Sequence, residues 1–137
     1  MSAKMNRTIK FRGKDLIHNK WIYGGLAEDR NDNAVILPKN NWQKGGCVDK
    51  DTIGQFTGFY DENGERIYEG DIVKFPHVGE CTRGIIVWNE KVGAWCIKLK
   101  GENSLGSTPV GEMLSSYTIE VVGNIHDNPE LIKEEQE

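Results

Sequence analysis

Short stretches in which apolar and polar residues alternate run along most of this chain. An alternation with a period of two is typical of a β-strand that buries one face. At residues 8–12 it leads us to expect Ile9 and Phe11 to point inward and Lys10 and Arg12 to point outward. The same pattern predicts further strands at 21–23, 34–37, 84–88, 94–99 and 117–121.

The most informative stretch is 55–75, which reads QFTGFYDENGERIYEGDIVKF. Asn63-Gly64 lies between two β-prone runs, and this pair is a strong hairpin signal because both residues tolerate a positive φ. Gly70 then marks a corner that leads into a third strand. The sequence therefore predicts a hairpin followed directly by another strand.

From residue 69 onward the predicted order is strand, loop, strand, tight turn, strand, long loop and strand, with the loops at 76–83 and 100–113. This order is typical of a small antiparallel barrel of SH3-like type. We predict a mainly β fold, with that barrel in the C-terminal half packed with an N-terminal β-hairpin or small sheet. Asn128-Pro129 predicts a short C-terminal helix, because proline fits the first helical position. The predicted divisions of the chain are 5–54, 55–127 and 128–137.

Three groups of residues carry a resemblance to a known family. The central group is Gly54-Gln55-Phe56-Thr57-Gly58, Asp61-Glu62-Asn63-Gly64 and Ile67-Tyr68-Glu69-Gly70-Asp71-Ile72-Val73. The flanking groups are Ile9-Lys10-Phe11-Arg12-Gly13-Lys14 with Trp21-Ile22-Tyr23-Gly24, and Val122-Gly123-Asn124-Ile125 with Asn128-Pro129-Glu130-Leu131. Together they resemble the YopX family of bacteriophage and prophage proteins.

The resemblance to the YopX family implies an origin in phage-derived DNA and carries over no biochemical role. It also implies a structural signature, consisting of Gly54, Gln55, Thr57, Gly58, Asn63, Gly64, Tyr68, Glu69, Gly70 and Asp71. Lys50-Asp51-Thr52 departs from the family pattern before this signature, and residues 76–83 and 100–113 match none of it.

Charge is unevenly distributed along the 137 residues, whose net charge is −4. A chain of this length suits one domain, alone or with a small appendage. The first twenty residues are basic, with Lys4, Arg7, Lys10, Arg12, Lys14 and Lys20 against Asp15 alone. The last eight are acidic, with Glu130, Glu134, Glu135 and Glu137 against Lys133. The negative total argues against a general nucleic-acid coat, since a basic surface supplies most of that affinity.

Cysteine usage favours a reducing compartment. Cys47, Cys81 and Cys96 are odd in number and have no CxxC spacing, which disfavours a disulfide framework and a zinc site. No apolar run approaches the roughly 20 residues that span a bilayer. We therefore expect a protein of the bacterial host cytoplasm that does not enter a membrane.

Candidate chemical sites are few, and each has a structural alternative. Asp61, Asn63, Glu65 and Glu69 faintly resemble a calcium loop, but the glycine position does not fit and turn chemistry explains the pattern. Glu69 and Asp71 could form an acid–base pair, although Gly70 between them favours a corner in which Asp71 bonds backbone N–H groups.

The remaining candidates for catalysis are a thiol and an imidazole. Cys81 or Cys96 with His77 would be the pair for nucleophilic catalysis, yet a cysteine in mid-strand is more often a buried, inert thiol. His18 and His126 have no Cys or His at ligand spacing. We expect no enzyme, no metal, no cofactor and no small-molecule substrate.

The best candidate for recognition is a basic strand with aromatic residues on the strand opposite. This candidate interaction surface consists of Lys10, Arg12, Lys14, Trp21 and Tyr23. Aromatic rings and cations together hold single-stranded nucleic acids on small β folds. The alternative is that the rings fill the core and the cations only face water.

Three hypotheses for function follow. The first is a non-enzymatic β-module that binds a protein partner or assembles with itself, through strand edges that lack obvious protecting prolines. The second is a nucleic-acid-binding regulator that uses the basic N-terminal strand, which the net charge disfavours. The third is an enzyme of unknown class.

Overall fold

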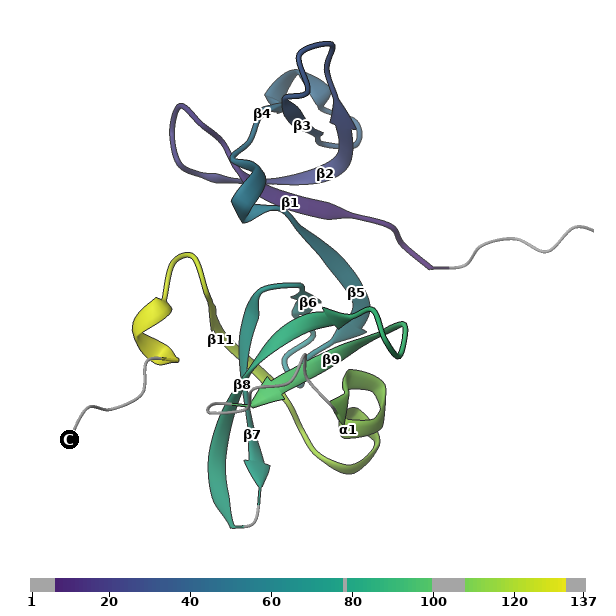
Figure 1. Cartoon of the computed structure of the whole chain (residues 1–137), viewed down its shortest axis with the longest axis vertical. Coiled ribbons are helices and arrows are strands. Elements are labelled where there is room, and N and C mark those ends of the chain that lie inside the picture. Colours follow the sequence, from purple (N-terminus) through teal and green to yellow (C-terminus); the bar gives the residue numbers. More distant parts are fainter. Residues whose placement is uncertain (1–6, 78, 100–107, 133–137) are drawn as a thin grey trace, which may run out of the picture. The chain divides into compact units, whose positions relative to one another are not determined.

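The computed structural model describes residues 7–77, 79–99 and 108–132 (Figure 1). The fold is mainly β, with two antiparallel sheets and one short α-helix. The chain divides into two compact units between Gly58 and Phe59. The division falls inside a strand, β5 (Gly54–Tyr60), so the chain passes from one unit to the next without a linker.

The first unit is a curled antiparallel sheet with the strand order β4-β3-β2-β1-β5. Its other strands are β1 (Phe11–Lys14), β2 (Trp21–Glu28), β3 (Ala34–Leu37) and β4 (Gly46–Cys47). Two 3-10 turns, at Trp42–Lys44 and Lys50–Thr52, lie on either side of β4. Val48 returns to Asp15 in an antiparallel bridge, so the sheet bends around a small core. That core consists of Ala34, Ile36 and Val48, with Phe11, Ile22 and Ile53 packed against it.

The orientation predicted for the first strand is wrong for two residues. Ile9 is 49% exposed and lies before β1, whereas Arg12 is only 5% exposed. The register explains this, because Arg12 pairs with Tyr23 and Lys14 with Trp21, which sets their side chains on the same face as those rings. Apolar and basic residues do alternate at 8–12, but the alternation does not show which face of the strand is covered by the rest of the protein.

Gly24 allows β2 to pass close to the end of β3. A Cβ at this position would lie 2.1 Å from the carbonyl oxygen of Leu37 and 2.5 Å from its carbonyl carbon. A Cβ on the neighbouring Gly25 would meet no atom within 4 Å. Gly24 is therefore required by the backbone packing of the first unit, and Gly25 is not.

Replacing Gly24 with Ala should destabilise the first unit, because the contact is with backbone atoms that cannot rotate away. Overpacking of this kind costs about 1–3 kcal/mol in the free energy of unfolding. Hydrogen exchange of the β2 and β3 amides measures the effect. Gly25→Ala is the matched control and should leave exchange unchanged; equal exchange in both variants would contradict the close approach.

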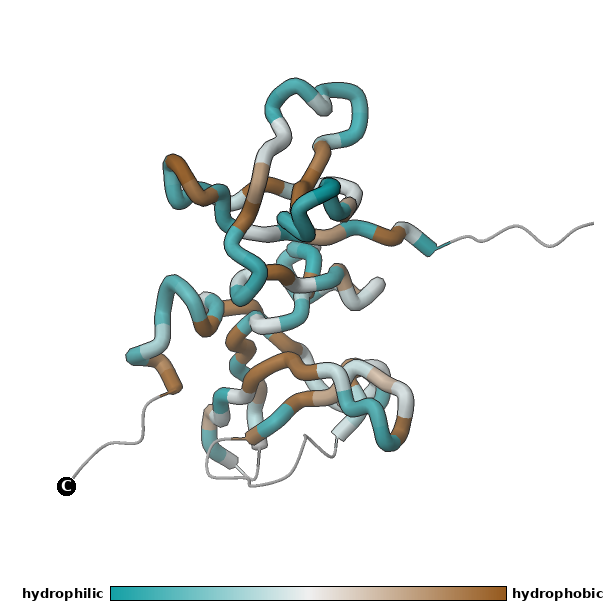
Figure 2. The backbone as a smooth tube through the Cα atoms, turned by 45° about the horizontal axis from the view of Figure 1, so that its top comes forward, coloured by the Kyte–Doolittle hydropathy of each residue, from teal (hydrophilic) through white to brown (hydrophobic). Residues whose placement is uncertain are grey.

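The second unit contains the larger core. The end of β5 forms a hairpin with β6 (Arg66–Tyr68), and a five-stranded sheet follows in the order β10-β9-β8-β7-β11. Its elements are β7 (Asp71–His77), β8 (Glu80–Asn89), β9 (Ala94–Leu99), β10 (Thr108–Pro109), α1 (Val110–Ser116) and β11 (Glu120–Asn124). The core consists of Ile67, Val73, Phe75, Ile86, Ile97, Val110, Met113 and Ile119. Figure 2 shows hydrophobic stretches, coloured brown, along the backbone of this unit.

Several local predictions in the second unit are confirmed. The hairpin turns at Asn63-Gly64, where Gly64 has a φ of +78°, and the corner uses Gly70 with a φ of +87°. The strand predicted at 94–99 is β9. Cys96 is fully buried within it, as expected for an inert mid-strand thiol.

Other predictions are wrong or shifted. Residues 76–77 and 80–83 are strand and not loop, because β7 pairs with β8 as far as His77 and Glu80, and Pro76 pairs with Cys81. The loop predicted at 100–113 overlaps the first four residues of α1, and Val110 and Met113 of this helix are buried one helical turn apart. Residues 100–107 lie outside the described part of the chain. The last strand begins at Glu120 rather than at residue 117.

The end of the second unit differs from the predicted helix. Pro129–Leu131 forms a single 3-10 turn, and the tail at 133–137 lies outside the described residues. The Asn128 side chain does not cap this turn, because its Oδ1 accepts the N–H of Asn124 at 3.2 Å. Within the described residues the second sheet has β10 and β11 as its outer strands, and its closure into an SH3-like barrel stays a prediction.

The Asp61 carboxylate ties the β5–β6 turn to β11. Its Oδ1 accepts the N–H groups of Asn63 and Glu65, at 2.9 and 2.8 Å. Its Oδ2 accepts the N–H of Val121, sixty residues later, at 2.9 Å. Asp61 is 7% exposed, so these bonds are largely shielded from water.

Replacing Asp61 with Ala should lower the free energy of unfolding by about 2–3 kcal/mol, because an unsatisfied buried donor costs about 1–3 kcal/mol. Urea denaturation followed by circular dichroism measures the loss. Glu65→Ala removes an exposed carboxylate from the same turn and should change stability by less than about 0.5 kcal/mol. Equal stability of the two variants would refute the role of Asp61.

Candidate protein-interaction surface

Four of the five residues predicted to form the interaction surface share one face of the first sheet. Arg12 pairs with Tyr23, and Lys14 pairs with Trp21. The Arg12 guanidinium carbon lies 4.6 Å from the Trp21 ring centroid, and the Lys14 Nζ lies 5.4 Å from it. Lys10 precedes the strand, and its carbonyl oxygen accepts the N–H of Phe56 at 2.8 Å.

This cation–π arrangement weakens the case for nucleic-acid binding at the same face. Trp21 already stacks against Arg12, so a base would have to displace the guanidinium to use that side of the ring. Arg12 is also 5% exposed and presents little charge to a phosphate. The contacts of Arg12 and Lys14 with the Trp21 ring stabilise the β1–β2 hairpin without any ligand.

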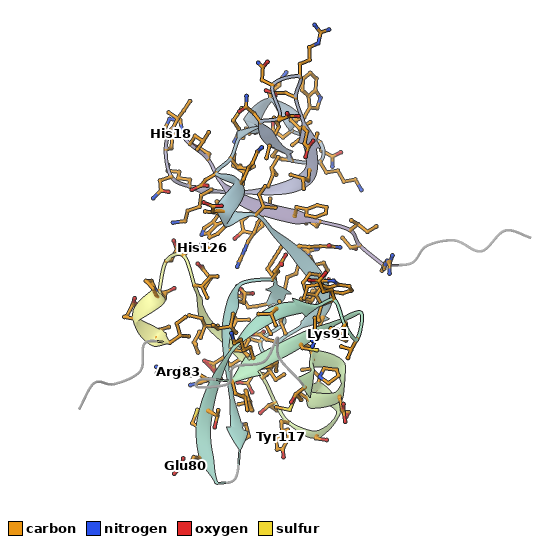
Figure 3. The ribbon with its side chains drawn as sticks, viewed as in Figure 1. His18, Glu80, Arg83, Lys91, Tyr117 and His126 are labelled. Atoms are coloured by element: carbon orange, nitrogen blue, oxygen red, sulfur yellow. The ribbon has the colours of Figure 1, made fainter. Side chains whose placement is uncertain are left out.

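A different feature of the first unit is open to a partner: the turn of residues 15–20, here called the β1–β2 turn. Leu16 is 63% exposed and Ile17 is 86% exposed. Figure 2 shows this turn ending in a hydrophobic tip, and Figure 3 shows the His18 side chain on it. The sequence carries one indication of this site, which is the presence of two aliphatic residues inside an otherwise polar turn. The sequence pattern did not predict a site there.

The β1–β2 turn is held in place by backbone hydrogen bonds at its base. The N–H of Asp15 donates to the carbonyl of Lys20 at 2.9 Å, and the N–H of Asn19 donates to the carbonyl of Asp15 at 3.0 Å. The N–H of Leu16 donates to the carbonyl of Cys47 at 3.1 Å, which joins the turn to β4. Asn19 adopts a φ of +56°, a conformation that asparagine tolerates.

The Asp15 side chain organises the interior of the turn. Its Oδ1 accepts the N–H groups of Ile17, at 2.7 Å, and of His18, and its Oδ2 lies 3.1 Å from the His18 Nδ1. The N–H of His18 is the main reason that the pKa of Asp15 lies below its ordinary value. Desolvation opposes this effect, and the His18 side chain and the Ile17 N–H add to it.

The second unit contains a groove beside β7, here called the β7 groove. Its volume is about 370 Å³, and its lining includes Glu62, Lys74, Phe75, Pro76, Glu80 and Glu120. It lies where β11 stops pairing with β7, because the last registered pair is Glu120 with Lys74. The Lys74 Nζ lies 3.6 Å from the Glu120 Oε1. Sequence analysis missed this groove because its residues come from segments far apart in the chain.

Both outer strands of the second sheet are protected against addition of a further strand. In β11 the N–H of Val121 donates to Asp61, and the N–H of Asn124 donates to Asn128. The two-residue β10 contains Pro109, which has no N–H to donate. The expectation that the edges lack a protecting proline is therefore wrong at Pro109.

The carboxylates that were candidates for chemical sites mostly accept backbone N–H groups and so have structural roles. The Oδ2 of Asp71, a residue 2% exposed, accepts the N–H of Tyr68 at 2.7 Å, as the corner interpretation expects. Glu69 beside it is half-buried. Both oxygens of Asp61 accept backbone N–H groups. Among the described residues no group of three or more His, Cys, Asp or Glu side chains is placed to hold a metal.

The predicted Cys–His pair is not assembled by any described contact. Cys81 is exposed and Cys96 is buried. The side chain of His77 lies outside the described residues. Across the described part of the chain, no helix has the length and apolar character to cross a bilayer.

The predicted structural signature forms turns and buried positions. Gly54 and Gln55 pair with β1, and Thr57 is 9% exposed. Gly58 has a φ of +92°, and Tyr68 is 4% exposed. With the Asn63-Gly64 turn and the Gly70 corner, these residues shape the β5–β6 hairpin and its exit into β7.

Comparison with known proteins agrees with this architecture. A family model described as YopX protein matches residues 10–133. The crystal structure of protein EF1440 from Enterococcus faecalis is similar, with a TM-score of 0.59 and 22% identity over 93% of this chain and 100% of that chain. At this identity the likeness establishes the fold alone. No curated protein matches the sequence.

The depressed pKa of Asp15 predicts a pH dependence of the β1–β2 turn. A carboxyl group whose folded-state pKa is lowered stabilises the fold above its unfolded value, about 3.9, and that contribution is lost as the pH falls through the folded value. In an NMR titration followed downward from pH 5, the amide signals of Ile17 and His18 should show a transition only below about pH 4, when the Asp15 carboxylate takes up a proton.

Asp15→Asn supplies the control for this titration, because the amide does not ionise in this range. Its Ile17 and His18 amide signals should show no transition below pH 4. A transition of the same midpoint in both proteins would assign the pH effect to another group.

Proposed function

This chain belongs to the YopX family, and we propose that it is a phage- or prophage-derived, non-enzymatic β-module of the host cytoplasm. It acts by binding a protein partner or by self-assembly. The observation that carries this proposal is the β1–β2 turn, which presents Leu16 and Ile17 to solvent from a fixed backbone.

A fixed, apolar turn favours binding on physical grounds. Exposed aliphatic side chains gain free energy when they leave water, about 25 cal/mol per Å² of apolar area. The backbone of the turn is already ordered by Asp15 and Cys47, so little further entropy is lost on binding. Lys14 and Lys20 flank the aliphatic pair and favour a partner site with an acidic rim.

We also expect the chain to recognise a partner through exposed side chains and not by adding a strand to the edge of the second sheet. The N–H groups of Val121 and Asn124 in β11 are occupied, and Pro109 in β10 has none to offer. Protein recognition by β-augmentation requires unpaired backbone groups along an edge. We therefore assign recognition to the turn and not to the edges of the second sheet.

The fold and the buried carboxylates support the remaining parts of the proposal. Five antiparallel strands, with α1 immediately before the last of them, favour an SH3-like closure of the second unit. Asp61 and Asp71 are occupied by backbone N–H groups, which favours a non-enzymatic role. A nucleic-acid-binding role through Lys10, Lys14 and Tyr23 is the second candidate, because these residues lie on or next to one face of the hairpin.

Affinity capture from bacterial lysate tests partner binding through the turn. Tagged wild-type protein should retain a specific protein, and Leu16→Ser/Ile17→Ser should retain at least tenfold less. Val92→Ser is the matched control, because Val92 is as exposed as Leu16 but lies on the β8–β9 turn. Equal loss with the control, or no loss with the double variant, would refute the assignment.

The nucleic-acid alternative has its own measurement. Binding to labelled DNA and RNA is titrated with salt, because counterion release makes affinity fall steeply as salt rises. Our proposal expects no specific binding at 150 mM salt. Tight, salt-dependent binding that is lost on Lys14→Glu would favour the alternative.

A further inference from the structure

We infer that the β7 groove accepts the β1–β2 turn of a second copy of this chain. The inference rests on the proposed function, because it names the self-assembly contact that the exposed turn would make. The two surfaces belong to different units of the chain: the turn consists of residues 15–20, and the groove lies beside β7.

The charges of the two surfaces are complementary. Glu62, Glu80 and Glu120 lie in the groove lining, and Lys74 alone is positive there. Because Lys74 is paired with Glu120, the two remaining glutamates are left to face a ligand. Lys14, the last residue of β1, and Lys20, in the turn, come before and after the aliphatic tip in the sequence, and the Lys14 Nζ lies 5.4 Å from the Trp21 ring centroid. The single acid of the turn is Asp15, whose carboxylate is directed into the turn by the N–H groups it accepts.

Both surfaces also have an apolar part. The exposed Pro76 lies among the charged residues of the groove, whereas Phe75, which is 2% exposed, belongs to the core beneath it. The groove volume of about 370 Å³ falls within the usual range for binding pockets, about 300–1,000 Å³. Leu16 and Ile17 are the two adjacent aliphatic side chains that the turn exposes. In the inferred contact Leu16 and Ile17 cover Pro76, and the flanking lysines face Glu62 and Glu80.

The contact is heterologous, because the turn and the groove are different surfaces of each molecule. Such a contact repeats head to tail and produces either closed rings or open chains. A six-residue turn buries much less than the roughly 1,600 Å² of a standard interface. Association is therefore weak, and we expect dissociation constants from about 10 micromolar to 1 millimolar.

Complementation between two variants tests the inference. The turn variant is Ile17→Asp, and the groove variant is Glu62→Lys/Glu80→Lys. Sedimentation velocity is run from 10 to 500 micromolar with a reductant, since Cys47 and Cys81 are exposed thiols. The weight-average mass of the wild-type protein should rise with concentration. Each variant alone should remain monomeric, with at least tenfold weaker association.

An equimolar mixture of the two variants should form one-to-one dimers and no larger species. The mixture has one intact turn, from the groove variant, and one intact groove, from the turn variant. Val92→Asp, an equally drastic change on the β8–β9 turn, should assemble like the wild type. Hydrogen exchange of β2 and β7 verifies that each variant is folded.

Three results would overturn the inference: a wild-type mass that is constant with concentration, assembly that survives Ile17→Asp, or a mixture that stays monomeric. A constant mass with protection of the groove that depends on Ile17 would indicate docking within one chain and would also overturn it. Lysate capture that depends on Leu16 and Ile17 would then still support the proposed function, so the two failures are distinguishable.

Discussion

The fold depends on one recurring interaction, in which an Asp or Asn side chain accepts backbone N–H groups a few residues further along the chain. Turns built in this way contain Asp15, Asp29, Asp61, Asn89 and Asn124. Each side-chain oxygen satisfies donors that a tight reversal removes from the β ladder. Asp61 extends the same interaction to Val121, so one carboxylate fixes both a hairpin and the placement of the last strand. Gly64, Gly70, Gly79 and Gly93, each with a positive φ, contribute to further reversals.

This use of polar side chains explains why carboxylates that resemble metal or acid–base sites in the sequence have structural roles in the fold. A carboxylate that accepts two or three N–H groups has few lone pairs left for a metal or a proton transfer, as Asp61 illustrates. Arg12 is similarly engaged, since its guanidinium lies against Trp21. Two exposed features that are not engaged in this way are an aliphatic turn in one unit and an acidic, partly apolar groove in the other. These two surfaces are the basis of the functional assignment.

The sequence predicted those elements whose causes are local. The Asn63-Gly64 turn, the Gly70 corner and the strand at 94–99 follow from backbone preferences and alternation within a few residues. The extension of β7 and β8 was missed because Pro76 and the charged residues after it conceal the alternation. The burial of Arg12 depends on a ring from the neighbouring strand, and the groove is assembled from residues up to 58 positions apart, Glu62 to Glu120. Contacts of this kind are set by the tertiary fold and leave no local pattern.

The construction of the β1–β2 turn has a consequence for how the protein changes over evolutionary time. Asp15, Asn19 and Cys47 determine the shape of the turn through backbone bonds, whereas the side chains of Leu16 and Ile17 belong to neither hydrophobic core. Mutations at these two positions are therefore nearly free of a folding penalty. A lineage that carries this module is able to exchange one binding specificity for another while its scaffold stays the same.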